Sequence, residues 1–203
     1  MYRRFFKRAI DIIFSLLGII VLSPFFLLLF IIIKIDSRGS IFFKQKRIGR
    51  YKTHFLMYKF RTMKIDTPQD IPTHLFEKPE KYITRVGKFL RMSSLDEVPQ
   101  LWNILVAHMS IIGPRPALWN QYDLIQERDK FGANDVRPGL TGWAQVNGRD
   151  ELPITVKAAL DGEYVKKISL FFDIKCLFMT VSSVIHSKGI VEGSREHRKK
   201  DSN

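Results

Sequence analysis

A long apolar segment near the amino terminus constrains this chain more than any other feature. Residues 12–33 form a run of 22 residues without a charged side chain. A helix needs about 20 apolar residues to cross the hydrocarbon core of a bilayer, so this run is long enough to span one. It exceeds the apolar region of a secretory signal peptide, and no small-residue cleavage site follows it. We therefore expect a chain attached to a membrane rather than a fully soluble protein.

The charges beside this run and the proline inside it bear on its topology. Four Lys/Arg residues precede the run and seven follow it by residue 52, although positive residues normally mark the cytoplasmic side alone. Pro24 follows Ser23 near the middle, where proline removes a backbone donor and kinks a helix. Each half would rise about 17 Å, roughly half a bilayer. The sequence predicts a re-entrant helix within a membrane segment 1–36, kinked at Ser23-Pro24, with Ser23 or a packed neighbour satisfying the freed backbone groups.

A single spanning helix that tolerates the proline is the alternative topology.

The charge balance of the whole chain indicates the kind of partner that it binds: the net charge is +13, and residues 1–52 alone contribute +9. Such a distribution favours an anionic membrane surface over nucleic acid, for which we find no recognised motif. The single cysteine, Cys176, excludes a disulfide framework and fits a domain facing the reducing cytosol.

The remainder of the chain, residues 37–203, is predicted to form one small, mostly helical cytosolic domain of the α+β class. Residues 40–46 and 53–63 are rich in aromatic and β-branched side chains and lie on either side of Gly49, so we expect a short hairpin. Residues 67–81 are predicted to be a loop. Helical patterns cover residues 84–92, 95–107, 117–131, 154–167 and 168–186. The last of these is amphipathic, and its phenylalanines suit either the membrane interface or the protein core.

Three turns rich in glycine and proline each carry an arginine, namely Arg115, Arg137 and Arg149. Arginine held on a stiff loop is suited to gripping phosphate groups through two parallel hydrogen bonds. The alternative is that proline and glycine only shape the turns, while the arginines are solvated.

Two adjacent carboxylates, Asp96 and Glu97, open a helical stretch just after Ser94. A capping box, in which Ser94 and Glu97 satisfy the first backbone N–H groups of a helix, explains the pair locally. Near basic loops, the same carboxylates would also suit a metal-bound pyrophosphate. These residues alone leave both interpretations open.

Five stretches together make the chain resemble the bacterial sugar transferase family, the monotopic phosphoglycosyl transferases that begin glycan assembly on a polyprenol carrier. They follow in the family's order and extend over nearly the whole chain. They are Ser23-Pro24, residues 58–63 (YKFRTM), 94–103 (SLDEVPQLWN), 109–116 (MSIIGPRP) and 137–149 (RPGLTGWAQVNGR).

The resemblance implies a two-step transfer. A UDP-sugar gives its sugar 1-phosphate to an enzyme carboxylate and releases UMP, and polyprenol phosphate then accepts the sugar phosphate. By resemblance, Asp96 is the nucleophile and a Mg²⁺ ligand, and Glu97 is its partner. The remaining site residues carried over in this way are Lys59, Arg91 and Arg115 around the phosphates, Gln145 and Arg149 in a loop on the nucleotide side, and Asp161 near the site.

The partners implied are a UDP-sugar, polyprenol phosphate, inner-membrane phospholipids and, downstream, further glycosyltransferases. Arg38 and Lys44 are expected to contact lipid headgroups on the cytoplasmic face. Residues 117–121 resemble relatives that use N-acetylated 6-deoxy sugars. Two other functions remain open: a membrane-anchored glycosyltransferase that releases UDP, and a membrane scaffold without catalytic activity.

Overall fold

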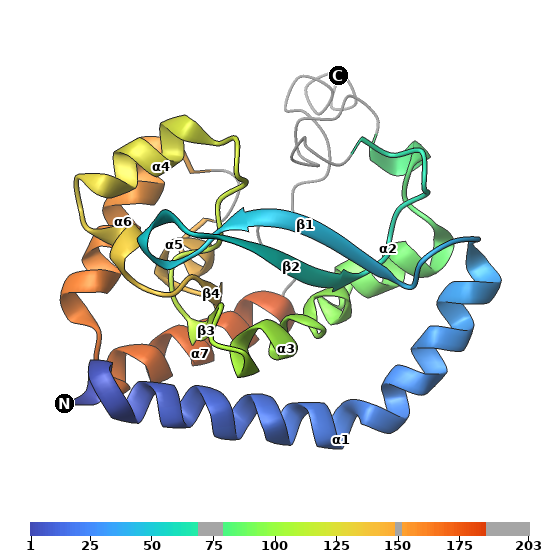
Figure 1. Ribbon diagram of the computed structural model, residues 1–203, viewed down its shortest axis with the longest axis horizontal. Helices are drawn as coiled ribbons and strands as arrows, with labels where there is room; N and C mark the ends of the chain where they lie inside the picture. Colours follow the sequence, from blue (N-terminus) through green and yellow to red (C-terminus); the bar gives the residue numbers. More distant parts are fainter. Residues whose placement is uncertain (69–78, 149–151, 186–203) are drawn as a thin grey trace.

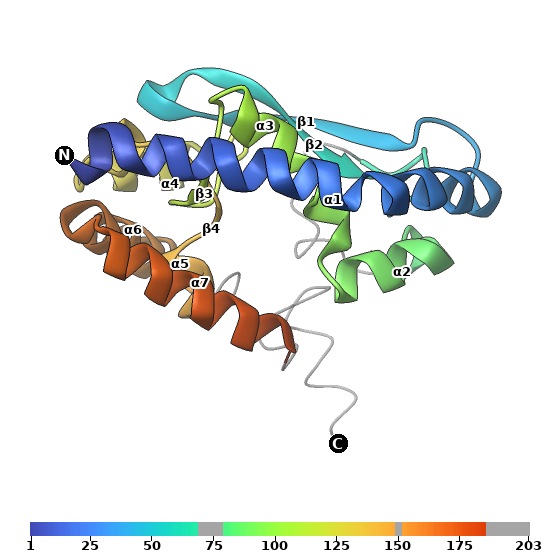
Figure 2. The ribbon, with the colours of Figure 1, turned by 90° about the horizontal axis from the view of Figure 1, so that it is seen from below.

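The computed structural model describes residues 1–68, 79–148 and 152–185 of the chain and has the predicted α+β class (Figure 1). One long helix runs along one edge of the molecule and spans its full length when seen from below (Figure 2). The elements are α1 (Lys7–Asp36), β1 (Phe42–Ile48), β2 (His54–Phe60), α2 (Arg85–Met92), α3 (Gln100–Leu105), β3 (Ser110–Ile112), α4 (Tyr122–Asp129), β4 (Gly139–Thr141), α5 (Trp143–Val146), α6 (Ile154–Lys167) and α7 (Leu170–Ile185).

Helix α1 contains the apolar run and is long and apolar enough to cross a membrane. Only 11% of its most apolar window is buried in the protein, so most of that surface needs another apolar environment. The ribbon changes direction between its dark-blue and light-blue halves (Figure 1). Pro24 cannot donate a hydrogen bond to the carbonyl of Ile20, and the hydroxyl of Ser23 donates to that carbonyl instead, at 2.8 Å. The prediction that Ser23 satisfies a freed backbone group is confirmed.

The amino-terminal half of α1 is attached to the rest of the protein by polar side chains. Lys7 Nζ lies 2.7 Å from Asp173 Oδ2 in α7, and Arg8 donates to the last two carbonyls of α3, at 2.7 and 2.9 Å. Asp11 accepts a hydrogen bond of 2.9 Å from the backbone N–H of Ile111 in β3. These contacts place the start of α1 against three separate elements.

The carboxyl-terminal half of α1 is attached instead by an apolar cluster. Its buried residues are Leu29, Ile33, Phe60 and Leu90, so α1 packs here on β2 and α2. The ring of Phe60 lies 5.7 Å from Phe26 and 6.0 Å from Phe30, both edge-on, in the geometry that aromatic pairs favour. Both halves of α1 therefore contact the same domain.

Two small sheets form in the domain, and the turns that carry Arg115 and Arg137 lie next to the second of them. β1 and β2 form the predicted antiparallel hairpin, with Phe42 opposite Phe60 and Ile48 opposite His54. β3 and β4 are parallel, and the turn after β3 contacts the start of β4, where the Gly139 N–H donates to the Pro114 carbonyl at 2.8 Å. Gly139 is required there, because a Cβ atom would lie 2.1 Å from the backbone nitrogen of Gly113.

The helices match the predictions where local periodicity is strong. α6 has the predicted limits, α2 begins one residue late after its Thr84 cap, and α7 covers most of residues 168–186. The helix predicted over 95–107 is wrong in part, because residues 95–97 form a 3-10 turn ahead of α3. Of the predicted loop, residues 69–78 lie outside the described residues, and Pro79–Lys81 form a 3-10 turn.

The helix predicted over 117–131 is also wrong at its start. Ala117 and Leu118 are buried and extend the hairpin instead, since the Ile48 N–H donates to the Ala117 carbonyl at 3.0 Å. Gln121 Oε1 accepts from the Leu118 N–H at 2.8 Å, which turns the chain into α4. A tertiary contact with β1 has overridden local helix propensity.

Helix α7 divides its phenylalanines between two environments. Phe172 packs against Trp143, with ring centroids 4.9 Å apart, whereas Phe171 and Phe178 are 85% and 72% exposed. The helix therefore has one face on the core and one apolar face outside it. Contact of that outer face with lipid stays a prediction.

Candidate active site

Asp96 and Glu97 lie on a short 3-10 turn, Leu95–Glu97, where the chain passes from α2 to α3. Ser94 has φ 57° and ψ 15°, a left-handed conformation, and its side chain makes no capping hydrogen bond. Glu97 directs its carboxylate to Lys59 and Arg115 instead. The capping-box interpretation is therefore wrong, and the two carboxylates are free of the helix end.

Glu97 is held by two cations from distant parts of the chain. Its Oε1 atom accepts hydrogen bonds of 2.7 Å from Lys59 Nζ in β2 and of 2.7 Å from Arg115 Nη2 in the turn after β3. Burial opposes the ionised form, but the charges and hydrogen bonds of Arg115 and Lys59 outweigh it, so the pKa of Glu97 lies well below its usual range. The hydrogen bonds of Glu97 therefore hold two cations in place.

At Asp96, burial outweighs the neighbouring cations in setting the pKa of the carboxylate. Its side chain is 11% exposed, and its Oδ2 atom lies 3.6 Å from Lys59 Nζ. Glu97 Oε1 lies closer to the same nitrogen, at 2.7 Å. Burial raises the pKa of Asp96, and the neighbouring charge of Glu97 adds to this, against the lowering effects of Lys59, Arg91 and Arg115. A buried carboxylate that is less tightly paired than its neighbour can act as a nucleophile or bind a metal ion.

The three predicted phosphate-contacting residues converge on this pair from separate elements. Lys59 comes from β2, Arg115 from the turn after β3, and Arg91 from the last turn of α2, where its charge acts on Asp96. A positively charged frame around two carboxylates is suited to a diphosphate, because the cations can neutralise charge at the transferring phosphorus. Their convergence agrees with the site that the sequence predicted, while their contacts with substrate stay a prediction.

The donor atoms at the pair fit Mg²⁺ bound largely through a substrate. No group of three His, Cys, Asp or Glu side chains suited to a metal ion occurs in the described part of the chain. Mg²⁺ is usually held by one or two carboxylates together with water and substrate phosphates, so it needs no such group. Asp96 is the better ligand, since Glu97 is already occupied by Lys59 and Arg115.

Asp161 is connected to Arg115 through Arg128. In α6 it is fully buried and accepts hydrogen bonds of 2.8 and 2.6 Å from the Nε and Nη2 atoms of Arg128. Arg128 in turn donates from Nη1 to the backbone carbonyl of Arg115, at 2.9 Å. The pair thereby holds the turn that carries Arg115. Sequence reasoning missed Arg128, because nothing in the pattern of α4 distinguishes it from a surface arginine.

The other predicted residues are less uniformly placed. Gln145 in α5 is buried and both its amide atoms lack a hydrogen-bond partner among the described residues, a state that a ligand would relieve. Arg149 lies outside the described residues. Arg137 does not join the acidic pair: its Nε atom donates to the carbonyl of Ala107 at 3.0 Å, and its side chain faces the start of α1. The three turn arginines thus do not form one described cluster.

Comparison with known proteins gives a consistent family match. Residues 2–187 match the model of a family described as bacterial sugar transferase. The exopolysaccharide production protein ExoY of Sinorhizobium fredii is 36% identical over 197 residues, which cover 90% of this chain and 87% of that protein.

Two longer relatives have names that state a reaction. The UDP-glucose:undecaprenyl-phosphate glucose-1-phosphate transferase of Escherichia coli is 38% identical, over 88% of this chain and 40% of its own length. The UDP-N-acetylgalactosamine-undecaprenyl-phosphate N-acetylgalactosaminephosphotransferase of Aeromonas hydrophila is 34% identical, over 91% of this chain and 45% of its own length. The chain therefore spans less than half of these two relatives, but most of ExoY.

Proposed function

This chain belongs to the bacterial sugar transferase family, and we propose that it transfers a sugar 1-phosphate from a UDP-sugar to polyprenol phosphate, such as undecaprenyl phosphate. It is a phosphoglycosyl transferase, as its named relatives are. The observation that carries the proposed mechanism is that Asp96 and Glu97 are paired with cations to different degrees. Glu97 is fixed between Lys59 and Arg115, while Asp96 beside it is less tightly paired.

The first proposed step forms a covalent intermediate on Asp96. A carboxylate oxygen of Asp96 attacks the β-phosphorus of the UDP-sugar, the bond to the α-phosphate oxygen breaks, and UMP leaves with the electron pair. Lys59 and Arg115, which Glu97 holds beside Asp96, lie where they can neutralise charge on the transferring group. The sugar phosphate is then attached to Asp96 through an acyl phosphate bond.

The second step restores the enzyme. A phosphate oxygen of polyprenol phosphate attacks the same phosphorus, the bond to Asp96 breaks, and the carboxylate is regenerated as the polyprenyl diphosphate sugar leaves. Asp96 and the substrate's phosphate oxygens would hold Mg²⁺, which when bound supplies positive charge at the transferring phosphorus. The Arg128–Asp161 pair holds the turn that carries Arg115 in the same position through both steps.

The arrangement of α1 supports a re-entrant topology on the cytoplasmic face of the bacterial inner membrane. Polar contacts of Lys7, Arg8 and Asp11 and the apolar cluster around Ile33 tie opposite ends of α1 to one domain. A straight spanning helix would place its two ends on opposite sides, so it could not make both sets of contacts. In such a position the enzyme meets a lipid phosphate at the interface, and its product starts a surface glycan such as a capsule, O-antigen, exopolysaccharide or glycoprotein glycan.

The released nucleotide tests the chemistry. Purified enzyme, Mg²⁺ and a UDP-sugar without any lipid acceptor should release up to one UMP per active site, and the peptide containing Asp96 should gain the mass of a sugar phosphate. Release of UDP would favour a glycosyltransferase that moves the sugar alone. Release of UMP only with the acceptor present, and no adduct after rapid quenching, would favour direct displacement. No nucleotide release from any UDP-sugar, with acceptor present, would favour a scaffold.

The sugar itself has to be found by screening. The relatives' names divide between glucose and N-acetylgalactosamine, and the resemblance of residues 117–121 to relatives that use N-acetylated 6-deoxy sugars adds a third class. A panel of UDP-sugars from all three classes, measured by UMP release with the acceptor present, identifies the substrate by its kcat/KM.

An impermeant thiol reagent tests the topology. Arg4 is exposed in the turn before α1, and the single native cysteine, Cys176, is buried. In an Arg4→Cys variant, labelling from outside intact cells should fail and labelling of inside-out vesicles should succeed. Efficient labelling from outside would contradict the re-entrant topology.

A further inference from the structure

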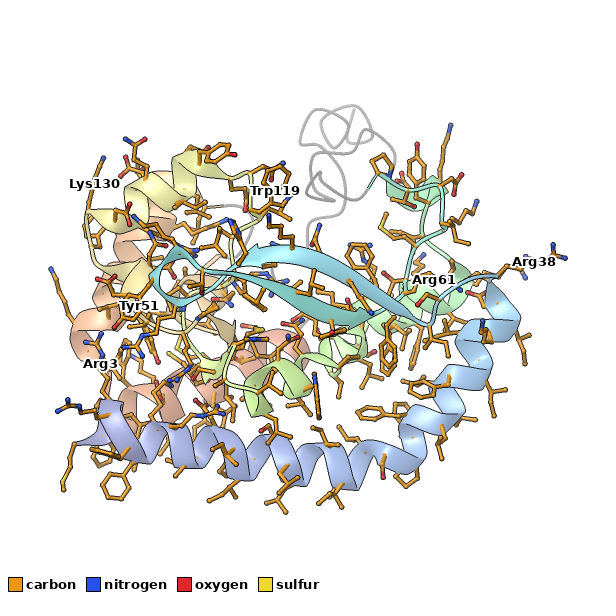
Figure 3. All side chains as sticks on the ribbon, viewed as in Figure 1. Arg3, Arg38, Tyr51, Arg61, Trp119 and Lys130 are labelled. Carbon is orange, nitrogen blue, oxygen red and sulfur yellow. The ribbon has the colours of Figure 1, made fainter. Side chains whose placement is uncertain are left out.

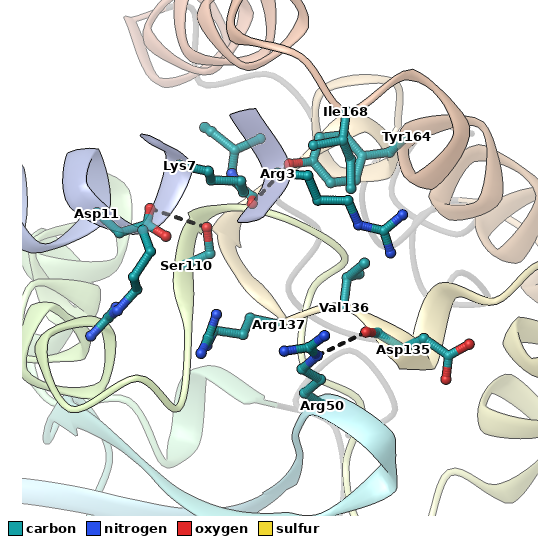
Figure 4. A pocket seen from close by; sticks show the side chains of 12 residues that line it. Arg3, Lys7, Asp11, Arg50, Ser110, Asp135, Val136, Arg137, Tyr164 and Ile168 are labelled. Atoms are coloured by element: carbon teal, nitrogen blue, oxygen red, sulfur yellow. Dashed lines mark hydrogen bonds between the residues drawn. The ribbon is translucent and has the colours of Figure 1, made fainter. Parts of the chain in front are cut away.

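A strongly basic cleft lies at the start of α1, away from the acidic pair. It has a volume of about 60 Å³ and opens between the first turns of α1, the tip of the β1–β2 hairpin and the segment before β4 (Figure 4). One water needs about 10–15 Å³ by the same measure, so the cleft has room for several waters or one phosphate group. None of Lys59, Asp96, Glu97 and Arg115 lines it.

Its lining is unbalanced in charge. Five cationic side chains line it against two carboxylates: Arg3, Lys7, Arg8, Arg50 and Arg137, with Asp11 and Asp135. The carboxylate of Asp135 points away from Arg50, which donates to the Asp135 backbone carbonyl at 3.0 Å (Figure 4). Asp11 already accepts hydrogen bonds from Ser110 Oγ and from the N–H of Ile111, at 3.1 and 2.9 Å.

The partners of the cations leave most of this charge uncompensated. Arg8, Arg50 and Arg137 donate to backbone carbonyls, which are dipoles without a net charge. Lys7 is the exception, with its ion pair to Asp173. Burial lowers the pKa of Arg137, and the neighbouring charges of Arg8 and Arg50 lower it further. An anion entering the cleft would relieve that repulsion.

The cleft also lies at the polar–apolar boundary of α1. Lys7 and Arg8 line it, and exposed apolar side chains lie on both sides of them: Phe5 and Phe6 just before α1, and Ile12, Ile13 and Phe14 one turn later. Ile168, which also lines the cleft, precedes α7, where Phe171 is 85% exposed. Apolar surfaces of two helices thus start beside the cleft, at the level where lipid phosphates lie when those surfaces enter a bilayer.

We propose that this cleft binds the phosphate of an anionic phospholipid, with Arg137 and Arg3 as its principal ligands. The site rests on the membrane attachment proposed above, and not on the transfer chemistry, since it shares none of the residues named for transfer. A phospholipid held there would fix the start of α1 at the headgroup level. It would thereby set the height of the domain above the membrane.

Lipid binding by the full-length protein tests the proposal directly. The protein is purified in a neutral detergent, delipidated and titrated with phosphatidylglycerol, phosphatidylcholine or sn-glycerol 3-phosphate, and native mass spectrometry counts the bound molecules. We expect one saturable phosphatidylglycerol, with phosphatidylcholine and glycerol phosphate each binding about tenfold more weakly, as the loss of a net anionic charge or of the acyl chains predicts. Equal binding of phosphatidylcholine, or tight binding of glycerol phosphate, would overturn the lipid assignment.

Charge-matched variants localise the site. Arg137→Gln and Arg3→Gln should each weaken phosphatidylglycerol binding about tenfold, as expected for loss of one charge-assisted contact. Lys130→Gln is the control, because Lys130 is exposed just after α4, lies apart from Arg3 (Figure 3) and does not line the cleft. It should change the affinity less than about twofold. Equal weakening by all three variants would mean diffuse attraction instead of a site.

Two further measurements keep the test decisive. The side chain of Arg3 makes no hydrogen bond or ion pair among the described residues. Arg3→Gln therefore removes a charge without breaking a side-chain contact, even if Arg137→Gln folds poorly. UMP release in the absence of lipid acceptor is measured on the same preparations. Failure of lipid binding with UMP release intact rejects this site alone, whereas failure of UMP release in the wild type rejects the proposed chemistry.

Discussion

At the acidic pair each carboxylate lies close to cations, whereas in the cleft at the start of α1 five cations share two carboxylates. In the first region Lys59 and Arg115 are oriented by Glu97, so the charges are fixed before any substrate arrives. In the second region Arg8, Arg50 and Arg137 donate only to neutral groups, mostly backbone carbonyls. The acidic pair is therefore organised for chemistry at a fixed position, while the cleft is organised to accept an anion.

Replacement of Asp96 separates the two regions most strongly. In Asp96→Asn, an amide replaces the carboxylate, so we expect UMP release to fall by about 10⁴-fold or more, as when an enzyme loses its nucleophile. The mass adduct should disappear. Phosphatidylglycerol binding at the cleft should stay unchanged in the same preparation, which also shows that the variant is folded. Retention of the adduct would remove Asp96 from its proposed role.

The buried pair behind Arg115 provides the next largest effect. Asp161→Asn leaves the buried guanidinium of Arg128 without its counter-charge, so the free energy of unfolding should fall by about 3–5 kcal/mol. Denaturant titration measures this loss. The rate of UMP release should also fall, by about tenfold, because Arg115 loses its fixed position.

A double variant separates stability from positioning. Asp161→Leu combined with Arg128→Met replaces the ion pair by apolar side chains, which restores stability in many proteins. It cannot restore the hydrogen bond from Arg128 to the Arg115 carbonyl. We therefore expect recovered stability with a rate that stays low. Recovery of both would show that the pair acts only through stability.

The pH dependence of the first step tests whether the pKa of Asp96 is raised while that of Glu97 is lowered. Asp96 must be ionised to attack, and its pKa is raised above the ordinary value of 3.8 by burial, so kcat/KM should fall with acid at a pH above that value. Lys59 lowers this pKa, so Lys59→Met should move the acid limb to still higher pH, in addition to lowering the rate. A limb that does not move would mean that another group titrates.

The smallest effect is expected in α1, outside both charged regions. Ser23→Ala removes the donor to the Ile20 carbonyl that Pro24 cannot supply, and should lower the free energy of unfolding by about 1 kcal/mol. Ser15→Ala is a comparison variant, because Ser15 Oγ donates to the Ile12 carbonyl of the same helix, where no proline follows, although Ser15 is buried and Ser23 is exposed. UMP release without lipid should stay unchanged in both. A loss in Ser15→Ala equal to that in Ser23→Ala would remove any special role of the Ser-Pro step.

Several features of the molecule could be predicted from local sequence because local physics decides them. The apolar run produced α1, the residues on either side of Gly49 produced the hairpin, and the 154–167 periodicity matched α6. In each case the determining residues are neighbours along the chain or repeat at the period of one element. The predicted approach of Lys59, Arg91 and Arg115 to the acidic pair came from the family resemblance, because no local pattern brings them together.

Other features depend on contacts between segments that are distant in the sequence, and the folded chain alone reveals them. The backbone at Ser94 and the ion pairs of Glu97 show that the pair is no capping box, although its residues have that spacing. The Arg115 and Arg137 side chains are separated by their tertiary contacts, because Arg115 donates to Glu97 whereas Arg137 donates to the Ala107 carbonyl and lines the cleft at the start of α1. Arg128 joins Asp161 across 33 positions in sequence, and no local period records such a contact.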